Sequence, residues 1–245
     1  DEHVADPAAP CLVVPNGPVV HYGELAALSA RIAHALVDAG CRPGDRIAVQ
    51  AEKHWTVLPL YLAALRAGLV YLPLNTDYFF GDAGPRVVVC GSERLGIVAA
   101  SARDATVLTL DAHGGELLDR AEGKSELFDT VPRAPDDLAA ILYTSGTTGR
   151  SKGAMLTHRN LASNALALVE AWGFTRGDVL LHALPVYHVH GLFVAIHCVL
   201  LSGSRMLWLP KFDAREVMAL LPKATVMMGV PTFYTRLLDH PGLTR

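Results

Sequence analysis

The sequence predicts an α/β fold in which layered, mostly parallel sheets carry flanking helices. Short apolar runs that predict strands alternate along the chain with stretches of helical spacing, a pattern typical of parallel sheets with crossover helices. Glycines follow the helical stretches, as at Gly40 and Gly68, where they favour helix ends. The 245 residues are 51% hydrophobic and 18% charged, which indicates a globular chain long enough to bury a core.

The first half of the chain begins this alternation. Leu25, Leu28 and Ile32 recur at helical spacing before the stop at Gly40. Apolar runs bounded by turn residues predict the strands. The predicted elements are a helix over 23–39, a strand over 46–50, a helix over 54–67, and strands over 69–72, 86–90, 97–99 and 106–110.

The second half repeats the pattern without an internal sequence repeat. The predicted elements are strands over 138–143 and 154–157, a helix over 158–172, a strand over 179–183, a helix over 190–201, a strand over 205–209, a helix over 214–221, a strand over 225–228 and a helix over 232–239. The segment TVPRAPDD at 130–137 is rich in proline and charge, which favours a seam. We therefore expect two α/β lobes, 1–132 and 133–245.

Composition excludes several classes of partner and site. The chain has 21 basic and 24 acidic side chains, a net charge of −3, and no basic stripe, so no nucleic-acid partner is expected. No uninterrupted apolar run reaches the roughly 20 residues that a membrane span needs, so no membrane partner is expected. The four cysteines are scattered, which argues against a disulfide framework or a zinc site and predicts a cytoplasmic protein.

A loop rich in glycine and hydroxyl side chains follows the strand predicted at 138–143. It has the sequence YTSGTTGRSKG over 143–153. Glycines let the main chain approach a ligand, successive N–H groups form an anion-binding concavity, and the hydroxyls and one lysine add donors and a positive charge. These features suit a polyphosphate, with a surface turn as the alternative. The predicted ligand-binding residues are Thr144, Ser145, Gly146, Thr147, Thr148, Gly149, Ser151, Lys152 and Gly153.

The loop is not a Walker P-loop. That motif places lysine directly after glycine at the start of a helix. Here Lys152 follows Ser151, and the next segment, AMLTH, predicts a strand. The sequence therefore excludes a P-loop NTPase.

The segment YTSGTTGRSKGAMLTHRN resembles the phosphate loop of the acyl-adenylate-forming superfamily, which contains acyl-CoA synthetases, luciferases and peptide-synthetase adenylation domains. Ser151 departs from the proline that is usual in the family. The segments YGELAALSARIAHALVDAGCRPGDRIAV, LRAGLVYLPLN and LPVYHVHGL extend the resemblance over nearly the whole chain. The resemblance implies the N-terminal large domain of an enzyme that uses ATP and Mg²⁺ to convert a carboxylic acid to acyl-AMP and then passes the acyl group to a thiol, usually CoA.

The same resemblance assigns roles within the loop. It implies that Thr144, Thr147, Thr148 and Lys152 hold the β- and γ-phosphates and the departing pyrophosphate. Thr148 is the expected magnesium ligand and Lys152 a catalytic residue.

The acid is indicated by three further segments. HALPVYHVHGLFVA, LWLPKFDAREV and GVPTFYTRLL most resemble malonyl-CoA synthetases, some of which also accept methylmalonate. The resemblance places His188 beside the reacting carboxylate as a catalytic and substrate-binding residue, with Val189 and His190 as further pocket residues. A second carboxylate needs a cation, and Arg236 offers a planar donor fork. The alternatives are packed histidines and a solvent-facing arginine.

Family segments beyond these have no counterpart in the 245 residues. They are the YGxTE segment with its magnesium-binding glutamate, the aspartate that grips the ribose, and the small C-terminal domain with its adenylation lysine. Three hypotheses stay open: a malonate-type carboxylate–CoA ligase, another acyl-CoA ligase or a carrier-protein-loading adenylation domain, and a non-catalytic nucleotide-binding relative. The expected partners are a small carboxylic acid, ATP and CoA, and the sequence is compatible with an oligomer.

Overall fold

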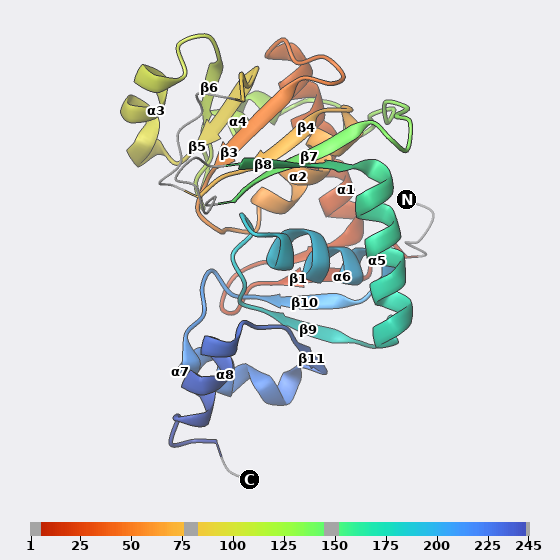
Figure 1. Cartoon of the computed structure of the whole chain (residues 1–245), viewed down its shortest axis with the longest axis vertical. Coiled ribbons are helices and arrows are strands. Elements are labelled where there is room, and N and C mark those ends of the chain that lie inside the picture. The colour runs from red at the N-terminus through yellow and green to blue at the C-terminus, as the bar shows by residue number, and fades with distance from the viewer. Residues whose placement is uncertain (1–5, 76–82, 145–151, 244–245) are drawn as a thin grey trace. The chain divides into compact units, whose positions relative to one another are not determined.

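A computed structural model describes residues 6–75, 83–144 and 152–243 (Figure 1). Within these ranges the fold is α/β with two sheets, as predicted. The chain divides into a terminal unit, Asp1–Glu24 with Ser163–Arg245, and a central unit, Leu25–Ala162. These boundaries differ from the expected lobes of 1–132 and 133–245. The first two strands of the chain belong to the same sheet as the strands after residue 178. The two strands that flank the glycine-rich loop belong to the same sheet as the strands of residues 46–109.

The central unit is built on a six-stranded sheet in the order β6-β5-β3-β4-β7-β8. Neighbouring strands are parallel except for the antiparallel pair β7 and β8. The strands are β3 (Arg46–Gln50), β4 (Val70–Pro73), β5 (Val87–Cys90), β6 (Thr106–Thr109), β7 (Leu138–Thr144) and β8 (Lys152–Thr157). The helices are α1 (Tyr22–Asp38, which begins in the terminal unit), α2 (Val57–Arg66), η1 (Ser92–Arg94), α3 (Leu95–Ser101) and α4 (Glu116–Ala121).

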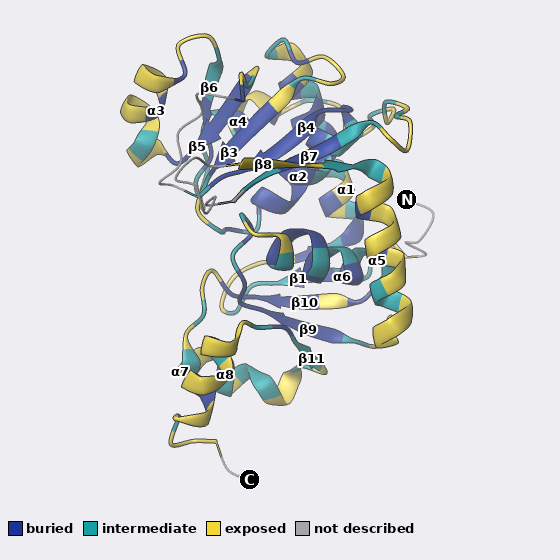
Figure 2. Ribbon diagram, viewed as in Figure 1, coloured by how far each residue is buried: buried dark blue, intermediate teal, exposed yellow. Residues whose placement is uncertain are grey.

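Burial explains why these runs form strands. Every residue of β4 and β5 is buried (Figure 2), as expected for parallel strands covered on both faces. Gly68 follows α2 with φ of +70°, a conformation that costs glycine little, and so turns the chain into β4. The predicted strand at 97–99 is wrong, because this run lies in α3. Ile97 is 60% exposed and Val98 is buried, which is the pattern of a surface helix with one inward position.

The terminal unit is built on a five-stranded sheet in the order β11-β9-β10-β1-β2. Its strands are β1 (Pro10–Val13), β2 (Val19–His21), β9 (Val179–His182), β10 (Arg205–Trp208) and β11 (Val226–Met227). Its helices are α5 (His158–Trp172, which begins in the central unit), the π-helix η2 (His190–Ala195), α6 (Ile196–Ser202), α7 (Ala214–Leu220), η3 (Leu221–Lys223) and α8 (Pro231–Leu238). β1 and β2 were not expected from the sequence.

Within the terminal unit, a side-chain hydrogen bond also joins Tyr22, near the N-terminus, to Ser204. The Tyr22 hydroxyl donates to the Ser204 carbonyl oxygen at 2.7 Å, and both residues are buried. Among the residues described, no helix is long and apolar enough to cross a membrane. All four cysteines are buried and free.

Candidate active site

The strands β7 and β8 are the two sides of the predicted phosphate loop. Their antiparallel register pairs Tyr143 with Gly153 and Thr144 with Lys152, so a seven-residue connection, 145–151, joins the last paired residues. This connection lies outside the described residues. It holds six of the predicted ligand-binding residues: Ser145, Gly146, Thr147, Thr148, Gly149 and Ser151. The described part of the loop is therefore its base, Thr144, Lys152 and Gly153.

The base places an exposed cation beside a glycine that packs closely on the neighbouring strand. Lys152 is the first residue of β8 and is exposed. A Cβ added at Gly153 would lie 2.8 Å from Cγ2 of Ile141 on the neighbouring strand. Gly153 lies in a strand, and its close packing across the hairpin favours a glycine there.

The chain after the loop forms the strand β8 before the helix α5 begins. The Thr157 hydroxyl accepts a hydrogen bond from the Asn160 backbone N–H at 3.2 Å, and Asn160 Oδ1 accepts one from the Thr157 backbone N–H at 3.0 Å. This reciprocal pair caps the N-terminus of α5 in the manner of a capping box. His158 is the first residue of α5, as predicted. Its pKa is lowered by burial and by the nearby charge of Arg133. The strand confirms that the loop is not a Walker motif.

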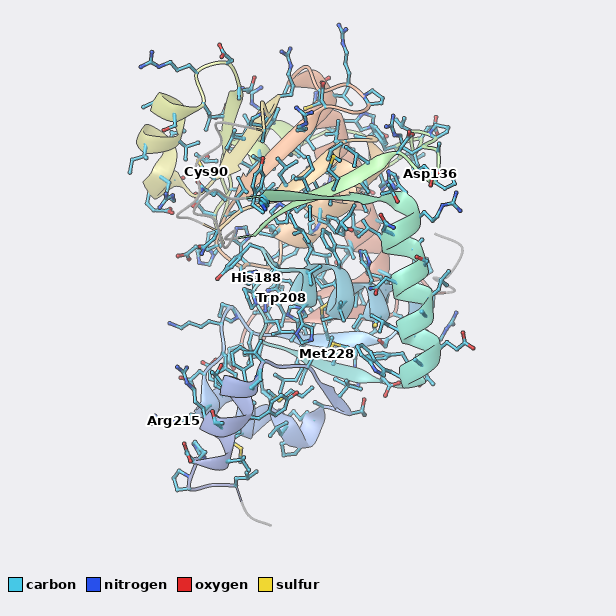
Figure 3. The ribbon with its side chains drawn as sticks, viewed as in Figure 1. Cys90, Asp136, His188, Trp208, Arg215 and Met228 are labelled. Carbon is cyan, nitrogen blue, oxygen red and sulfur yellow. The ribbon has the colours of Figure 1, made fainter. Side chains whose placement is uncertain are left out.

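A cavity of about 480 Å³ lies at the other end of the same hairpin, where β8 passes into α5. Three of its lining residues are arginines, which would suit an anion. Each already has protein partners: Arg66 donates to the carbonyls of Ala26 and Phe128, Arg133 pairs with Asp137 at 3.1 Å, and Arg159 pairs with Asp136 (labelled in Figure 3) at 2.9 Å. Because its cations are compensated in this way, we do not assign the cavity to the active site.

The predicted substrate histidine lies in the terminal unit, on the turn between β9 and η2 (Figure 3). His188 and Val189 are exposed, and His190 is half-buried as the first residue of η2. The Leu192 backbone N–H donates to the His188 carbonyl at 3.0 Å, which joins the turn to the helix. The structure thus brings the three predicted pocket residues together on one short segment. Arg236 lies elsewhere, exposed in the last turn of α8.

Three residues that the sequence reasoning had not singled out hold this turn. His182, the last residue of β9, stacks on Trp208, the last residue of β10, with ring centroids 4.9 Å apart and an interplanar angle of 18°. Both side chains are 1% exposed. His182 Nε2 lies 2.9 Å from the Gly191 carbonyl oxygen in η2. A Cβ at Gly191 would lie only 2.1 Å from the Pro185 carbonyl oxygen, so the helix and the turn approach as closely as a glycine allows.

A further histidine, His197 on α6, is a packing residue. Burial lowers the pKa of His197 to about 4, so its ring is neutral at neutral pH. Its ring lies 5.8 Å from that of Phe193. In the part of the chain that the structure describes, no group of three or more histidine, cysteine, aspartate or glutamate side chains is arranged to hold a metal ion.

The central unit thus combines a mostly parallel sheet with an antiparallel hairpin at its edge, and the loop of that hairpin is rich in residue types that bind phosphate. Residues 2–245 match the family described as AMP-binding enzyme, and the chain belongs to that family. The resemblance to the acyl-adenylate-forming superfamily is thereby confirmed.

Individual relatives agree with this assignment. The chain is 35% identical over 217 residues to Mus musculus "Malonate--CoA ligase ACSF3, mitochondrial", covering 82% of the chain and 37% of that protein. It is 33% identical over 239 residues to an Amycolatopsis feruloyl-CoA synthase, covering 92% of the chain and 46% of that protein. The crystal structure of ATP-bound MatB from Rhodopseudomonas palustris aligns with a TM-score of 0.96 and 52% identity, covering 99% of this chain and 50% of that one. The chain thus spans half or less of the length of these relatives.

Proposed function

We propose that the intact protein is an ATP-dependent, AMP-forming acid–thiol ligase that acts on malonate, with methylmalonate as the next best acid and CoA as the acceptor. The observation that carries the proposal is the β7–β8 hairpin, which holds Lys152 at the base of a hydroxyl-rich loop within a chain of the AMP-binding family. The malonate–CoA ligase among the relatives, at 35% identity, supports the acid.

The reaction explains the residue types in the loop. A carboxylate that attacks the α-phosphate approaches a polyanion, so oriented donors and cations must neutralise the phosphates. The exposed Lys152 would supply a full charge to the β- and γ-phosphates, and the hydroxyl of Thr144 and those within 145–151 would donate hydrogen bonds. Mg²⁺, with Thr148 as its proposed protein ligand, would add further neutralisation when bound.

His188 is the proposed contact to the reacting carboxylate. Its imidazole is exposed, so a substrate can reach it, and an imidazole N–H can donate to a carboxylate or acyl-phosphate oxygen. Val189 and His190 would form the pocket around it. Arg236, exposed on α8, is the proposed partner of the distal carboxylate.

A second function is favoured by one observation. The feruloyl-CoA synthase matches over more of the chain, 239 residues, than the mouse ligase does, so another acyl-CoA ligase is the alternative. The cytoplasmic location stays a prediction from cysteine usage; the mouse relative is named as mitochondrial.

The test is a panel of acids in ATP–pyrophosphate exchange with the intact protein. We expect malonate to give the highest rate, methylmalonate the next, and acetate, octanoate and ferulate much lower rates. A preference for ferulate or octanoate would replace malonate with another acid. Exchange with malonate but transfer only to a carrier protein would identify an adenylation domain. Absence of exchange with every acid would identify a non-catalytic relative.

A further inference from the structure

We infer that His182 is a positioning residue that holds the substrate histidine turn through the Gly191 carbonyl. The inference rests on the proposed role of His188. It concerns a different residue, buried behind the turn, that does not itself reach substrate.

The hydrogen bond from His182 to the Gly191 carbonyl joins the two ends of the turn. The turn leaves the sheet at His182 and enters η2 near Gly191, and the His182 side chain joins these two points at 2.9 Å. The Leu192 N–H, next to Gly191, donates to the His188 carbonyl at 3.0 Å. A displacement of the first turn of η2 therefore moves the backbone that carries His188.

The ring of His182 is fixed in orientation. Its stacking on Trp208 and its burial leave it no room to rotate, and the two residues are paired in the β9–β10 register. A carbonyl oxygen only accepts hydrogen bonds, so Nε2 of His182 must carry the hydrogen that it donates to Gly191. The side chain acts as a rigid donor at a set distance from the sheet.

The close approach of Gly191 to Pro185 limits movement of η2 in the opposite direction. Because the Pro185 carbonyl lies so close to Gly191, the first turn of η2 cannot move toward the 184–185 segment. His182 holds the same residue from the β9 side. Gly191 is thus constrained by two independent contacts. η2 is also a π-helix, a wide turn that occurs often at functional sites.

The variants separate the donor from the ring. His182→Phe keeps a planar ring against Trp208 and removes the donor. His182→Gln places an amide nitrogen near the position of Nε2, whereas His182→Asn places one near Nδ1. His197→Phe is the matched control, because it removes another histidine that packs within the same unit.

We expect His182→Phe to lower kcat/KM for malonate about 10- to 100-fold, the effect of a misplacement on the order of 1 Å, with KM for ATP unchanged. Glutamine should restore most of the rate and asparagine should not. His197→Phe should leave kcat/KM for malonate and KM for ATP in the same ratio as in the parent protein.

A double-mutant cycle with His188→Ala shows whether His182 acts through His188. In the His188→Ala background, His182→Phe should have little further effect on kcat/KM for malonate. If the two losses multiply, or if KM for ATP rises in parallel, the inference is wrong while the proposed function stands. If His188→Ala alone leaves malonate kinetics unchanged, the proposed role of His188 fails instead. Thermal unfolding of each variant, measured in parallel, identifies any that are not folded at the assay temperature.

Discussion

The phosphate-loop hairpin and the histidine turn provide their chemistry in opposite ways. In the hairpin the proposed ligand-binding groups are consecutive in the sequence, and strand pairing positions the exposed Lys152. In the turn, His188 is one exposed residue whose position depends on buried residues before and after it, His182, Gly191 and Trp208. A substitution at the first site should therefore change activity without stability, whereas one behind the second should change both.

The largest effect is expected at the hairpin, from Lys152→Ala. Loss of a full charge that stabilises developing phosphate charge should lower the rate of ATP–pyrophosphate exchange about 10²- to 10³-fold, equivalent to about 3–4 kcal/mol. Since Lys152 is exposed, the unfolding temperature should stay the same. Lys211→Ala, at another exposed lysine, is the control and should leave both quantities unchanged. An unchanged exchange rate in Lys152→Ala would remove the loop from the proposed mechanism.

The next effect is expected behind the turn, from Gly191→Ala. The added methyl would meet a backbone carbonyl 2.1 Å away, and backbone cannot move aside as a flexible side chain can. We expect a loss of about 2–3 kcal/mol in the free energy of unfolding, measured by denaturant titration, together with a lower malonate rate. Gly177→Ala, where the nearest atom is 3.6 Å away, is the control. A Gly191→Ala protein of unaltered stability would show that the turn is not held as tightly as the contacts indicate.

The same contrast decides what the sequence could predict. The hairpin loop and its flanking strands were predictable because phosphate binding requires particular residue types in consecutive order, and the strand exit excluded a Walker motif. The roles of His182 and Trp208 were not predictable, because the two residues meet only when β9 pairs with β10. Likewise β1 and β2 were missed although Pro15 and Asn16 form a turn between them, since each strand is only three or four residues long. The short run at 97–99 had no periodicity that could separate a strand from a helix.

A smaller effect is expected from acid, through His197 on α6. Burial lowers its pKa from 6.5 to about 4 in the folded protein, so between these values the unfolded chain binds a proton that the folded chain does not. Stability should therefore be unaffected above pH 6.5 and should fall as the pH drops from 6.5 toward 4, by about 1–3 kcal/mol in total. His197→Phe should lose this part of the pH dependence in denaturant titrations. Equal slopes in the parent and variant proteins would mean that His197 is not buried as neutral imidazole.

The smallest effect is expected from Gly153→Ala in the hairpin, and it sharpens the contrast with Gly191. Here the added methyl would lie 2.8 Å from Cγ2 of Ile141, a side-chain atom that can shift more readily than the backbone carbonyl that opposes Gly191, so the cost should be smaller. We expect a loss of about 1 kcal/mol or less in the free energy of unfolding. Because Gly153 lies next to Lys152, the exchange rate should fall modestly and by less than in Lys152→Ala. The double variant Gly153→Ala with Ile141→Leu removes the Cγ2 branch that the added methyl would meet and should recover part of the loss. A Gly153→Ala protein as unstable as Gly191→Ala would show that the hairpin is as tightly packed as the turn. The distinction between a loop positioned by strand pairing and a turn positioned by buried residues would then fail.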